Sequence, residues 1–439
     1  MNKLITNTNV KIDKLVPGGQ GIATLDDGRK AFFWNALPGE IITEYEIIKK
    51  KSKYTEAIAT KITNDNPHRI PARDNIAIST SPWQIMDYTY ELEQKLALLQ
   101  ESFRQEGLEC NAAHVKTDGK QWFYRNKMEY SLYWDIAEER IKLAFRKRGT
   151  HRKIPINTSS LEMPEIYEKA LTIINDLNAR GEEAYKYQSL LLRANQRGQI
   201  SGGLYENYQP HPVFPNLTDK ILGHEYSYSP NGFFQINLPV YEMALREIKE
   251  HISTENVLDL YAGVGTIGLS VARDKNLTLV EVNKSAFAEL ERNCMRARRE
   301  LGIVGAWRSH GEPVGAAPAT AAGERDRYPT SQDSSGPQNG PSQKRQLRSV
   351  LSKSEEALDF IQPDQTVILD PPRAGCDAKL LKKLLKTTPR KIIYLSCNPS
   401  TQARDLRILT EKYKIEKIVP FNFFPRTPHL ENLVILNVV

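Results

Sequence analysis

The stretch NVLDLYAGVGTIGLSVARD, residues 256–274, decides the fold of the C-terminal half of this 439-residue chain. An apolar strand pattern runs into a loop with Gly263 and Gly265, and the chain then continues with a helical pattern. Glycines at this place let a ligand approach the backbone at the carboxyl edge of a parallel sheet.

On both sides of this stretch, helix and strand patterns alternate from residue 231 to residue 439. Apolar strands are predicted at LTLVEVN (277–283), TVILDPP (366–372), KIIYLSCNP (391–399) and NLVILNVV (432–439). This alternation predicts a doubly wound, Rossmann-like α/β domain. Residues of about 305–345 are rich in Gly, Pro, Ala, Ser and Gln, so we expect them to form a disordered insert in this domain.

Acidic residues lie at the ends of several of these strands. Glu281 ends a strand 22 residues after Asp259, where a carboxylate can accept hydrogen bonds from a ribose. The glycine loop and this carboxylate suit an adenosyl ligand such as S-adenosylmethionine, with another nucleotide as the alternative. Asp370 follows a strand in LDPPRAG, and Glu431 precedes the last strand, where a carboxylate is a candidate general base.

Cys397 follows a further strand, in the stretch SCNPS (396–400). Packing is the default interpretation, because buried cysteine is common and usually inert. Ser, Asn and Pro are turn formers, however, and this strand end should face the same sheet edge as Asp370 and Glu431. These neighbours favour a reactive thiol.

The N-terminal half predicts two further domains. In residues 1–62, short alternating strands are separated by Gly and Pro turns, which predicts a small β-barrel that binds nucleic acid or merely docks on its neighbour. Residues 63–230 predict an α+β domain with a basic loop at 146–153. The net charge of +7 mildly favours a polyanionic partner. Since there is no signal peptide pattern and no apolar run of ~20 residues, we expect a cytoplasmic protein without a membrane span.

Taken together, these motifs resemble the RNA 5-methyluridine methyltransferases that use S-adenosylmethionine. The resemblance covers nearly the whole chain, through these stretches in order: GGQGIATLDDGRKAFFWNALPGE (18–40), YRNKMEYS (124–131), FFQIN (233–237), DLYAGVGTIGL (259–269), VEVNKSA (280–286), LDPPRAG (369–375), LSCNPSTQARDL (395–406) and FPRTPHLENLV (424–434). It implies a TRAM-like RNA-binding barrel, a central RNA-binding domain and a class I methyltransferase domain.

The resemblance also implies roles for single residues. Cys397 is similar to the nucleophile of the family, and Glu431 to the base that removes the C5 proton of the uracil. With the two glycines of the loop, the cofactor site implied by the resemblance consists of Gln235, Tyr261, Glu281 and Asp370. The positions implied to face the target uracil are Tyr130, Gln235 and Asp370.

The chain departs from the family at two places. Many members bind a [4Fe–4S] cluster through four cysteines, but Thr80 and Trp83 occupy two of these positions and INTSSLEM (156–163) contains none. We therefore expect no iron–sulfur cluster and no other metal. Lys353 stands where the family offers Asp or Asn to the adenine, so either the alignment shifts here or this contact is lost.

The resemblance predicts an enzyme that methylates C5 of a uridine in structured RNA, with RNA as the partner and no obligate protein partner evident. A uridine of 23S ribosomal RNA is the first choice, because TRAM barrels accompany mostly rRNA-directed members, and a T-loop uridine of tRNA is close behind. A non-catalytic RNA-binding or RNA-folding protein is the alternative of another class. A 5-methylcytosine enzyme is disfavoured, since the chain lacks the Cys that follows Pro in those enzymes.

Overall fold

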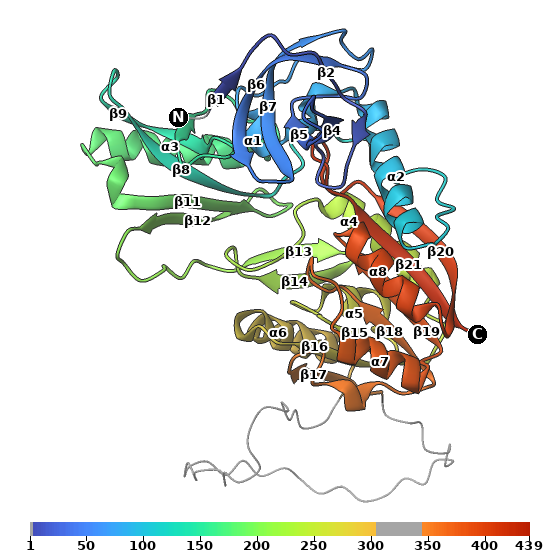
Figure 1. Ribbon diagram of the computed structural model, residues 1–439. Helices are drawn as coiled ribbons and strands as arrows, with labels where there is room; N and C mark the ends of the chain where they lie inside the picture. The colour runs from blue at the N-terminus through green and yellow to red at the C-terminus, as the bar shows by residue number, and fades with distance from the viewer. Residues whose placement is uncertain (1–2, 304–344) are drawn as a thin grey trace, which may run out of the picture.

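The computed structural model describes residues 3–303 and 345–439. The expected disordered insert at about 305–345 falls outside these residues, apart from its last position. Within the described residues the strands form sheets of seven, five, two and seven strands. The two seven-stranded sheets stand at opposite ends of the molecule (Figure 1). In the same part of the chain, no helix combines the length and the apolar character that crossing a membrane requires.

The N-terminal sheet has the order β1-β6-β7-β5-β4-β3, with β2 beside β6. The alternating pattern of β5 turns Ala31 and Phe33 toward a core that they share with Ile42 and Tyr45. The order leaves β1 and β3 as unjoined ends, so a closed barrel is not confirmed. The strands are β1 (Lys3–Ile5), β2 (Val10–Lys11), β3 (Lys14–Leu15), β4 (Gly21–Thr24), β5 (Lys30–Trp34), β6 (Ile41–Lys50) and β7 (Tyr54–Thr63).

The central part contains a five-stranded antiparallel sheet in the order β10-β9-β8-β11-β12 and the hairpin β13–β14. Helix α3 buries Ile166, Ala170 and Ile174 against this sheet, at the spacing of one helix face. The elements are α1 (Ala77–Thr80), η1 (Pro82–Ile85), α2 (Tyr88–Gln105), β8 (Lys127–Asp135), β9 (Arg140–Arg146), β10 (Lys153–Pro155), α3 (Pro164–Ala179), η2 (Ala184–Lys186), β11 (Tyr187–Ala194), β12 (Ile200–Glu206), β13 (Leu217–Ile221) and β14 (His224–Tyr228).

The C-terminal sheet has the order β17-β16-β15-β18-β19-β21-β20, with β20 and β21 antiparallel to the rest. Both faces are covered: Val257 of β15 packs with helices α4 to α6, and Leu258 and Leu260 pack with α7 and α8. Burial on both faces explains the continuous apolar runs of these strands. The elements are α4 (Leu238–Glu250), β15 (Asn256–Leu260), α5 (Thr266–Val271), β16 (Asn276–Glu281), α6 (Lys284–Glu300), β17 (Leu347–Leu351), η3 (Leu358–Phe360), β18 (Gln365–Leu369), α7 (Ala378–Thr387), β19 (Lys391–Ser396), α8 (Pro399–Leu409), β20 (Tyr413–Phe421) and β21 (Glu431–Val438).

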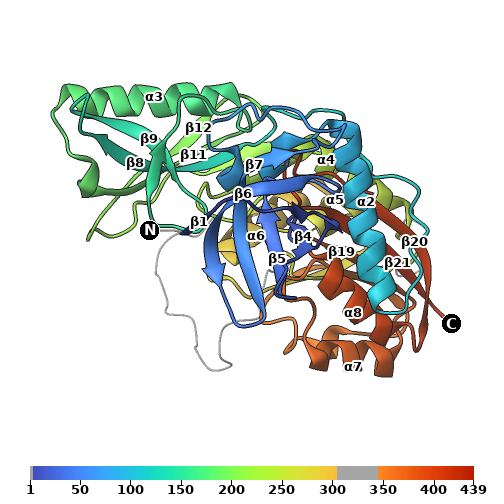
Figure 2. The ribbon, with the colours of Figure 1, turned by 45° about the horizontal axis from the view of Figure 1, so that its top comes forward.

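Helix α2 belongs to the central segment by sequence but packs on the C-terminal sheet. Leu99 and Phe103 are fully buried in the same cluster as α7 and α8. The hydroxyl oxygens of Ser102 and Ser400 lie 3.2 Å apart, and Figure 2 shows α2 running beside α8. The helix therefore connects the N-terminal half to the domain with the sheet edge described next.

The order of the C-terminal sheet reverses direction between β15 and β18. From β15 the chain moves outward to β16 and β17, and it then returns to the other side of β15 with β18 and β19. In open α/β sheets, ligands bind outside the carboxyl ends of the strands at such a reversal. The fold thus points to the loops that follow β15, β16, β18 and β19.

Candidate active site

The register of the C-terminal sheet brings four of the predicted site residues to one edge. Tyr261, Asp370 and Cys397 each come directly after a parallel strand, and Glu431 begins the antiparallel strand β21 at the same edge. The pairs that lie just inside this edge are Leu260 with Leu369, Leu369 with Tyr394, and Ser396 with Asn432. Because Ser396 pairs with Asn432, the next position outward places Cys397 opposite Glu431.

The turn after β19 holds Cys397 between a strand and a helix. Asn398 is the N-cap of α8, where its Oδ1 accepts a hydrogen bond from the Ser400 amide at 3.3 Å, and Pro399 occupies the first turn. The Asn398 Nδ2 also donates to the carbonyl oxygen of Arg373 at 2.9 Å. The turn is thereby attached to the DPPR loop, and the thiol of Cys397 is left partly accessible.

The groups around the thiol are acids that hold their protons. Burial raises the pKa of Cys397 to about 11, with further contributions from Glu431 and Asp370, while the Arg373 guanidinium opposes this rise. Burial raises the pKa of Asp370 to about 7. Burial and the nearby Asp370 also raise the pKa of Glu431 well above its usual value. The acids close to the thiol therefore favour their protonated forms, while Arg373, which is exposed, favours the charged forms of Cys397 and Glu431.

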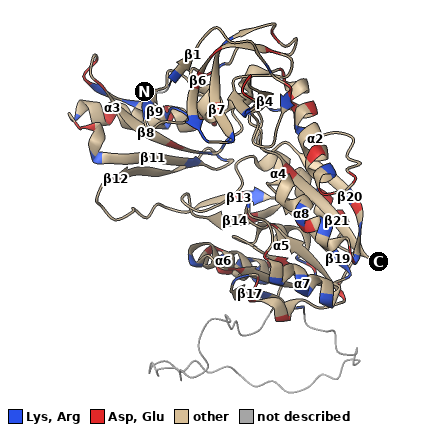
Figure 3. Ribbon diagram, in the orientation of Figure 1, with Lys and Arg blue, Asp and Glu red and all other residues tan. Residues whose placement is uncertain are grey.

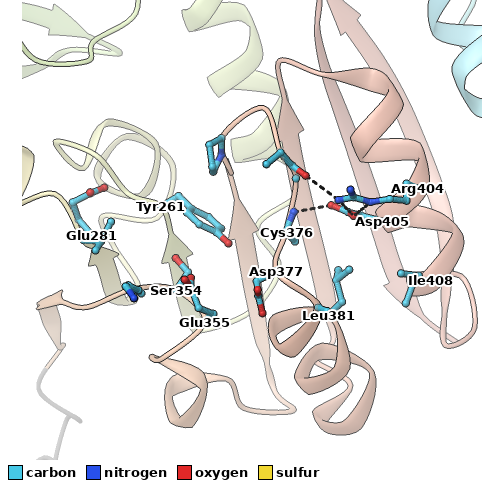
Figure 4. A pocket seen from close by; sticks show the side chains of 16 residues that line it. Tyr261, Glu281, Ser354, Glu355, Cys376, Asp377, Leu381, Arg404, Asp405 and Ile408 are labelled. Atoms are coloured by element: carbon cyan, nitrogen blue, oxygen red, sulfur yellow. Dashed lines mark hydrogen bonds and ion pairs between the residues drawn. The ribbon is translucent and has the colours of Figure 1, made fainter. Parts of the chain in front are cut away.

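Next to this group lies a cavity of about 860 Å³ at the carboxyl edge of the sheet. Tyr261 and Glu281 line it from the β15 and β16 side, and residues after β17 and β18 form the opposite walls (Figure 4). Glu281 accepts hydrogen bonds from the amides of Gly263 at 2.8 Å and Asn283 at 2.6 Å. Each carboxylate oxygen retains a free lone pair, so Glu281 can still accept from a ribose hydroxyl.

The glycine loop has the backbone geometry that its sequence suggested. Gly263 and Gly265 have φ of +57° and +87°, and Gly265 is the N-cap of α5. A Cβ on Gly265 would lie 2.5 Å from Cδ1 of Leu290, so a side chain does not fit there. The glycines shape the loop from behind and are not among the residues that line the cavity.

Gln235 lies at the junction between the central and C-terminal parts. Its side chain is buried. Its main-chain carbonyl oxygen accepts hydrogen bonds from Asn126 Nδ2 at 3.0 Å and from the guanidinium of Arg193 at 3.2 Å. Arg193 is itself fully buried and also donates to the carbonyl of Phe234 at 2.6 Å. The loop that carries Gln235 is thus fixed by the central sheet, although Gln235 does not line the cavity.

Tyr130 is not brought to this group. Its side chain is 0% exposed within the central sheet, and its hydroxyl donates to Glu162 Oε1 at 2.6 Å. A side chain with no exposed surface has no face for a base, so its placement argues against the expected substrate contact. The expectation came from the family resemblance of YRNKMEYS (124–131), and the same residues form an alternating strand that is equally typical of a core tyrosine.

Arg373 is the residue at this edge to which the sequence analysis assigned no role. It follows Asp370 in the DPPR loop, and its guanidinium lowers the pKa of the Cys397 thiol through charge and a hydrogen bond. Its charge also favours the ionised form of Glu431. The sequence contained a signal for Arg373, because the loop LDPPRAG that follows the strand and carries Asp370 to the sheet edge also carries Arg373.

The two positions at which the family often has cluster cysteines are filled by packing groups. Trp83 is buried in an apolar cluster, and its Nε1 donates to the carbonyl of Gly19 at 3.0 Å. The hydroxyl of Thr80 donates to the carbonyl of Ile76 at 3.4 Å. Over residues 3–303 and 345–439, no three His, Cys, Asp or Glu side chains gather in a way that would hold a metal ion.

Comparisons with known proteins find RNA methyltransferases. The model of the family described as tRNA (Uracil-5-)-methyltransferase matches residues 354–439, which include Asp370, Cys397 and Glu431. A protein of Treponema denticola is 27% identical over 97% of both chains, and one of Enterococcus faecalis is 25% identical over 97% of this chain and 96% of its own. Both are described as uncharacterized RNA methyltransferases.

A solved structure shows the same fold over the whole chain. The Pyrococcus abyssi tRNA (uracil-54, C5)-methyltransferase, in complex with S-adenosyl-L-homocysteine, has a TM-score of 0.71 at 21% identity. The match covers 98% of this chain and 100% of that protein. The family model over residues 354–439 and the relatives along the full length show that the chain is similar to RNA methyltransferases, and the solved structure shows the fold that it shares.

Proposed function

We propose that this protein methylates C5 of a uridine in RNA through a covalent adduct between Cys397 and uracil C6. The observation that carries the proposal is the meeting of Cys397, Glu431 and Asp370 at the sheet edge, next to a cavity large enough for an adenosyl ligand. Such a pairing of thiol and carboxyl group is what the reaction needs, because it requires both a nucleophile and a separate base.

The chemistry follows from the weak nucleophilicity of uracil C5. Sγ of Cys397 bonds to C6, and the electrons of the C5–C6 double bond move to O4 as an enolate. Bound S-adenosylmethionine would supply the methyl group: C5 would form a bond to the methyl carbon while the methyl–sulfur bond breaks, with its electron pair left on the sulfur of S-adenosyl-L-homocysteine. Glu431 removes the proton from C5, the C5–C6 double bond forms again, and the bond from Sγ to C6 breaks.

The first step, the attack of Cys397 on C6, depends on the fraction of its thiol that is ionised. With a thiol pKa of about 11, only a small fraction of Cys397 is thiolate at neutral pH. Arg373 is the cation that favours this fraction, since its guanidinium lowers the pKa of the thiol. Glu431 has a raised pKa, which makes its carboxylate a stronger base when the C5 proton has to be removed.

The residues of the cavity fit S-adenosylmethionine. Glu281 offers carboxylate oxygens to ribose hydroxyls, and Tyr261 offers a ring wall. Gly263 and Gly265 let the backbone approach the ligand. Gln235 and Asp370 are our candidates for contacts with both the cofactor and the uracil. A flipped uracil has to reach the Cys397 side of this edge, as target bases of modifying enzymes leave their stack.

We propose that residues 1–62 and 63–230 form RNA-binding domains. Where the two parts meet, Arg148 of the basic loop lies over the ring of Trp34 at 3.8 Å, and Lys147 pairs with Glu46 at 2.8 Å. Figure 3 shows Lys and Arg segments at this junction of the central sheet with β6 and β7. Cations beside aromatic rings are the combination that single-stranded nucleic acids bind.

For the RNA itself, a uridine of 23S ribosomal RNA is the target that the N-terminal sequence motif favours. A tRNA T-loop uridine is the second candidate, because the structural relative that spans the whole chain acts, by its title, on tRNA uracil 54. Labelled S-adenosylmethionine incubated with separated rRNA and tRNA that lack 5-methyluridine should give labelled 5-methyluridine in one of them. Label in 5-methylcytidine contradicts the uridine assignment, and binding of RNA without label favours a non-catalytic protein.

Glu431→Gln tests the covalent mechanism directly. Without the base, the C5 proton stays in place and the methylated adduct should accumulate as a protein–RNA complex that survives denaturing electrophoresis. Cys397→Ala on the same background should remove this complex, and Cys110→Ala is the matched control for loss of a partly buried thiol elsewhere. A complex that persists without Cys397 rules out this nucleophile.

A further inference from the structure

The loop between α2 and β8 carries two neighbouring aromatic rings, Trp122 and Phe123, with guanidinium groups beside them. The guanidinium carbon of Arg73 is 5.3 Å from the centre of the Trp122 ring and 5.2 Å from the centre of the Phe123 ring. The guanidinium carbon of Arg426 is 4.8 Å from the centre of the Trp122 ring. Trp122 thus contacts two cations, and Arg73 contacts two rings.

These two cations differ in their surroundings. The Arg426 side chain is 3% exposed, lies 3.8 Å from Glu91 and donates to the Met86 carbonyl at 2.7 Å. Arg73 is exposed, and among the described residues no carboxylate forms an ion pair with its guanidinium. A guanidinium beside two rings, without an ion-pair partner, has its planar surface and its donors available for a ligand. Arg426 therefore has a structural role, whereas Arg73 has binding capacity to offer.

A strained backbone holds the two rings. Phe123 has a φ of +55°, which is a genuine outlier for a bulky residue. Its amide donates to the Ser160 carbonyl at 2.9 Å, and the Arg125 amide donates to the Leu161 carbonyl at 2.9 Å. Strain of this kind persists only where the surrounding structure fixes it, and it is common at sites that bind ligands. The backbone therefore favours a binding surface over an incidental contact of side chains.

The same loop is attached to the segment that leads to Glu431. The Tyr124 hydroxyl donates to the Pro425 carbonyl at 3.0 Å, and the Arg426 guanidinium donates to the side chain of Gln121. Pro425 and Arg426 belong to the stretch FPRTPHLE (424–431), which ends at Glu431. The surface at Arg73 and the candidate base of the reaction are thus connected through one short segment.

Further cations lie within electrostatic reach of His429, two residues before Glu431. Desolvation lowers the pKa of His429 to about 4, and the charges of Arg373, Lys95, Arg125 and Arg148 lower it further. These cations come from the sheet edge, from α2, from the loop of the two rings and from the basic loop. Positive charge from separate segments at one place is the pattern that an RNA backbone requires.

A base that leaves its stack also leaves its neighbours without a stacking partner. Unpaired RNA bases stack on aromatic rings and on guanidinium planes, and each stacked base strengthens binding about tenfold or more. We infer that Arg73, supported by Trp122 and Phe123, is a stacking surface for an unpaired base that flanks the target uridine. The inference rests on the proposed methylation of uridine, and it adds an unpaired neighbour to what this protein recognises.

Fluorescence anisotropy of the full chain with labelled single-stranded RNA tests the inference. The probe is a nine-nucleotide RNA with one central uridine among adenosines, together with four versions that each carry one abasic nucleotide, at one of the two positions on either side of the uridine. The wild type should bind one of these versions about tenfold more weakly than the intact RNA, because one stacked base is lost. Arg73→Ala should bind the intact RNA about tenfold more weakly than the wild type does and should no longer distinguish it from that version.

Two further variants separate stacking from charge and from general effects. Arg73→Lys keeps the charge but loses the planar group, so it should weaken binding nearly as much as Arg73→Ala does. Arg390→Ala removes an exposed arginine that precedes β19, at the end of the sheet opposite to Cys397. It is the matched control and should change RNA binding by less than about twofold.

The outcomes separate this inference from the proposed function. Full binding by Arg73→Lys refutes the inference, because charge alone would then explain the effect of Arg73→Ala. A wild type that binds all five RNAs equally, or that does not bind the intact RNA, refutes it as well. So does an Arg73→Ala variant that still distinguishes the abasic version. All of these results leave the proposed methylation standing, since label transfer to RNA tests it independently. Absence of label in every RNA, with the Arg73 effects present, overturns the methylation and leaves an RNA-binding surface.

Discussion

A buried charge network beneath the loop that leads to Glu431 gives the sharpest prediction for stability. Lys95 and Glu91 of α2 are completely buried, with Lys95 Nζ 2.9 Å from Glu91 Oε1. The same ammonium donates to Asn422 Oδ1 at 2.5 Å and to the Phe424 carbonyl at 3.1 Å. Both oxygens of Glu91 accept from the amide of Arg426 at 3.1 Å. One carboxylate thus serves two buried cations, since the Arg426 guanidinium lies 3.8 Å away.

Glu91→Gln removes the single anion from this network. Lys95 and Arg426 then lose the carboxylate that lies between them, and burial already lowers the pKa of Lys95. Loss of one partner from a buried ion pair costs about 3–5 kcal/mol of unfolding free energy. Lys95→Met should cost less, about 1–3 kcal/mol, because Glu91 keeps Arg426 while two oxygen acceptors lose their donor.

Urea unfolding followed by tryptophan fluorescence measures both costs, since Trp83 packs in the neighbouring cluster. The double variant should be less destabilised than the sum of the two single variants, with a coupling of about 0.5–3 kcal/mol. A cost below about 1 kcal/mol for Glu91→Gln, or a larger cost for Lys95→Met, refutes the view that Glu91 neutralises both cations.

Three further predictions concern the sheet edge. Because the pKa of the Cys397 thiol is raised to about 11, its thiolate fraction grows with pH. The value of kcat/KM for methyl transfer should therefore rise about tenfold per pH unit from pH 7 to pH 9. A value of kcat/KM that does not change over this range contradicts the prediction. Burial raises the pKa of Asp259 to about 8, so in the folded protein it keeps a proton that the unfolded chain loses near pH 4. The unfolding free energy of the wild type should then fall by up to about 1.4 kcal/mol for each pH unit between pH 4 and pH 8. Asp259→Asn should reduce this dependence on pH, as measured by urea unfolding at pH 5 and pH 8. The same dependence in the variant would contradict the prediction. Gly265→Ala should lower the unfolding free energy more than Gly28→Ala does. Both glycines have a positive φ, but an added Cβ at Gly265 would lie 2.5 Å from Leu290 Cδ1, whereas at Gly28 it meets nothing within 4 Å. Equal losses of unfolding free energy would show that backbone strain alone matters.

Much of the C-terminal domain was predictable because its signals are local. Apolar strands, the glycine loop and the order of strand and helix patterns are properties of short stretches, and they predicted the doubly wound sheet seen here. Parallel strands also expose their carboxyl ends at one edge, so the positions of Asp370 and Cys397 near each other followed from strand ends alone. Whether the N-terminal strands close into a barrel was less predictable, because closure depends on pairing between distant strands, and the strand order leaves β1 and β3 unjoined.

What the sequence by itself determined is which residue types stand at which strand ends. A thiol follows β19, glycines follow β15, and carboxylates stand at the end of β16, after β18 and at the start of β21. Only the tertiary structure decided how these groups are used. It buried Tyr130 in the central sheet, turned Lys353 outward, and placed α2 with its buried Lys95 on a sheet from a distant segment. The physical reason is that burial and charge pairing are sums over neighbours from several segments, and no local pattern contains those neighbours.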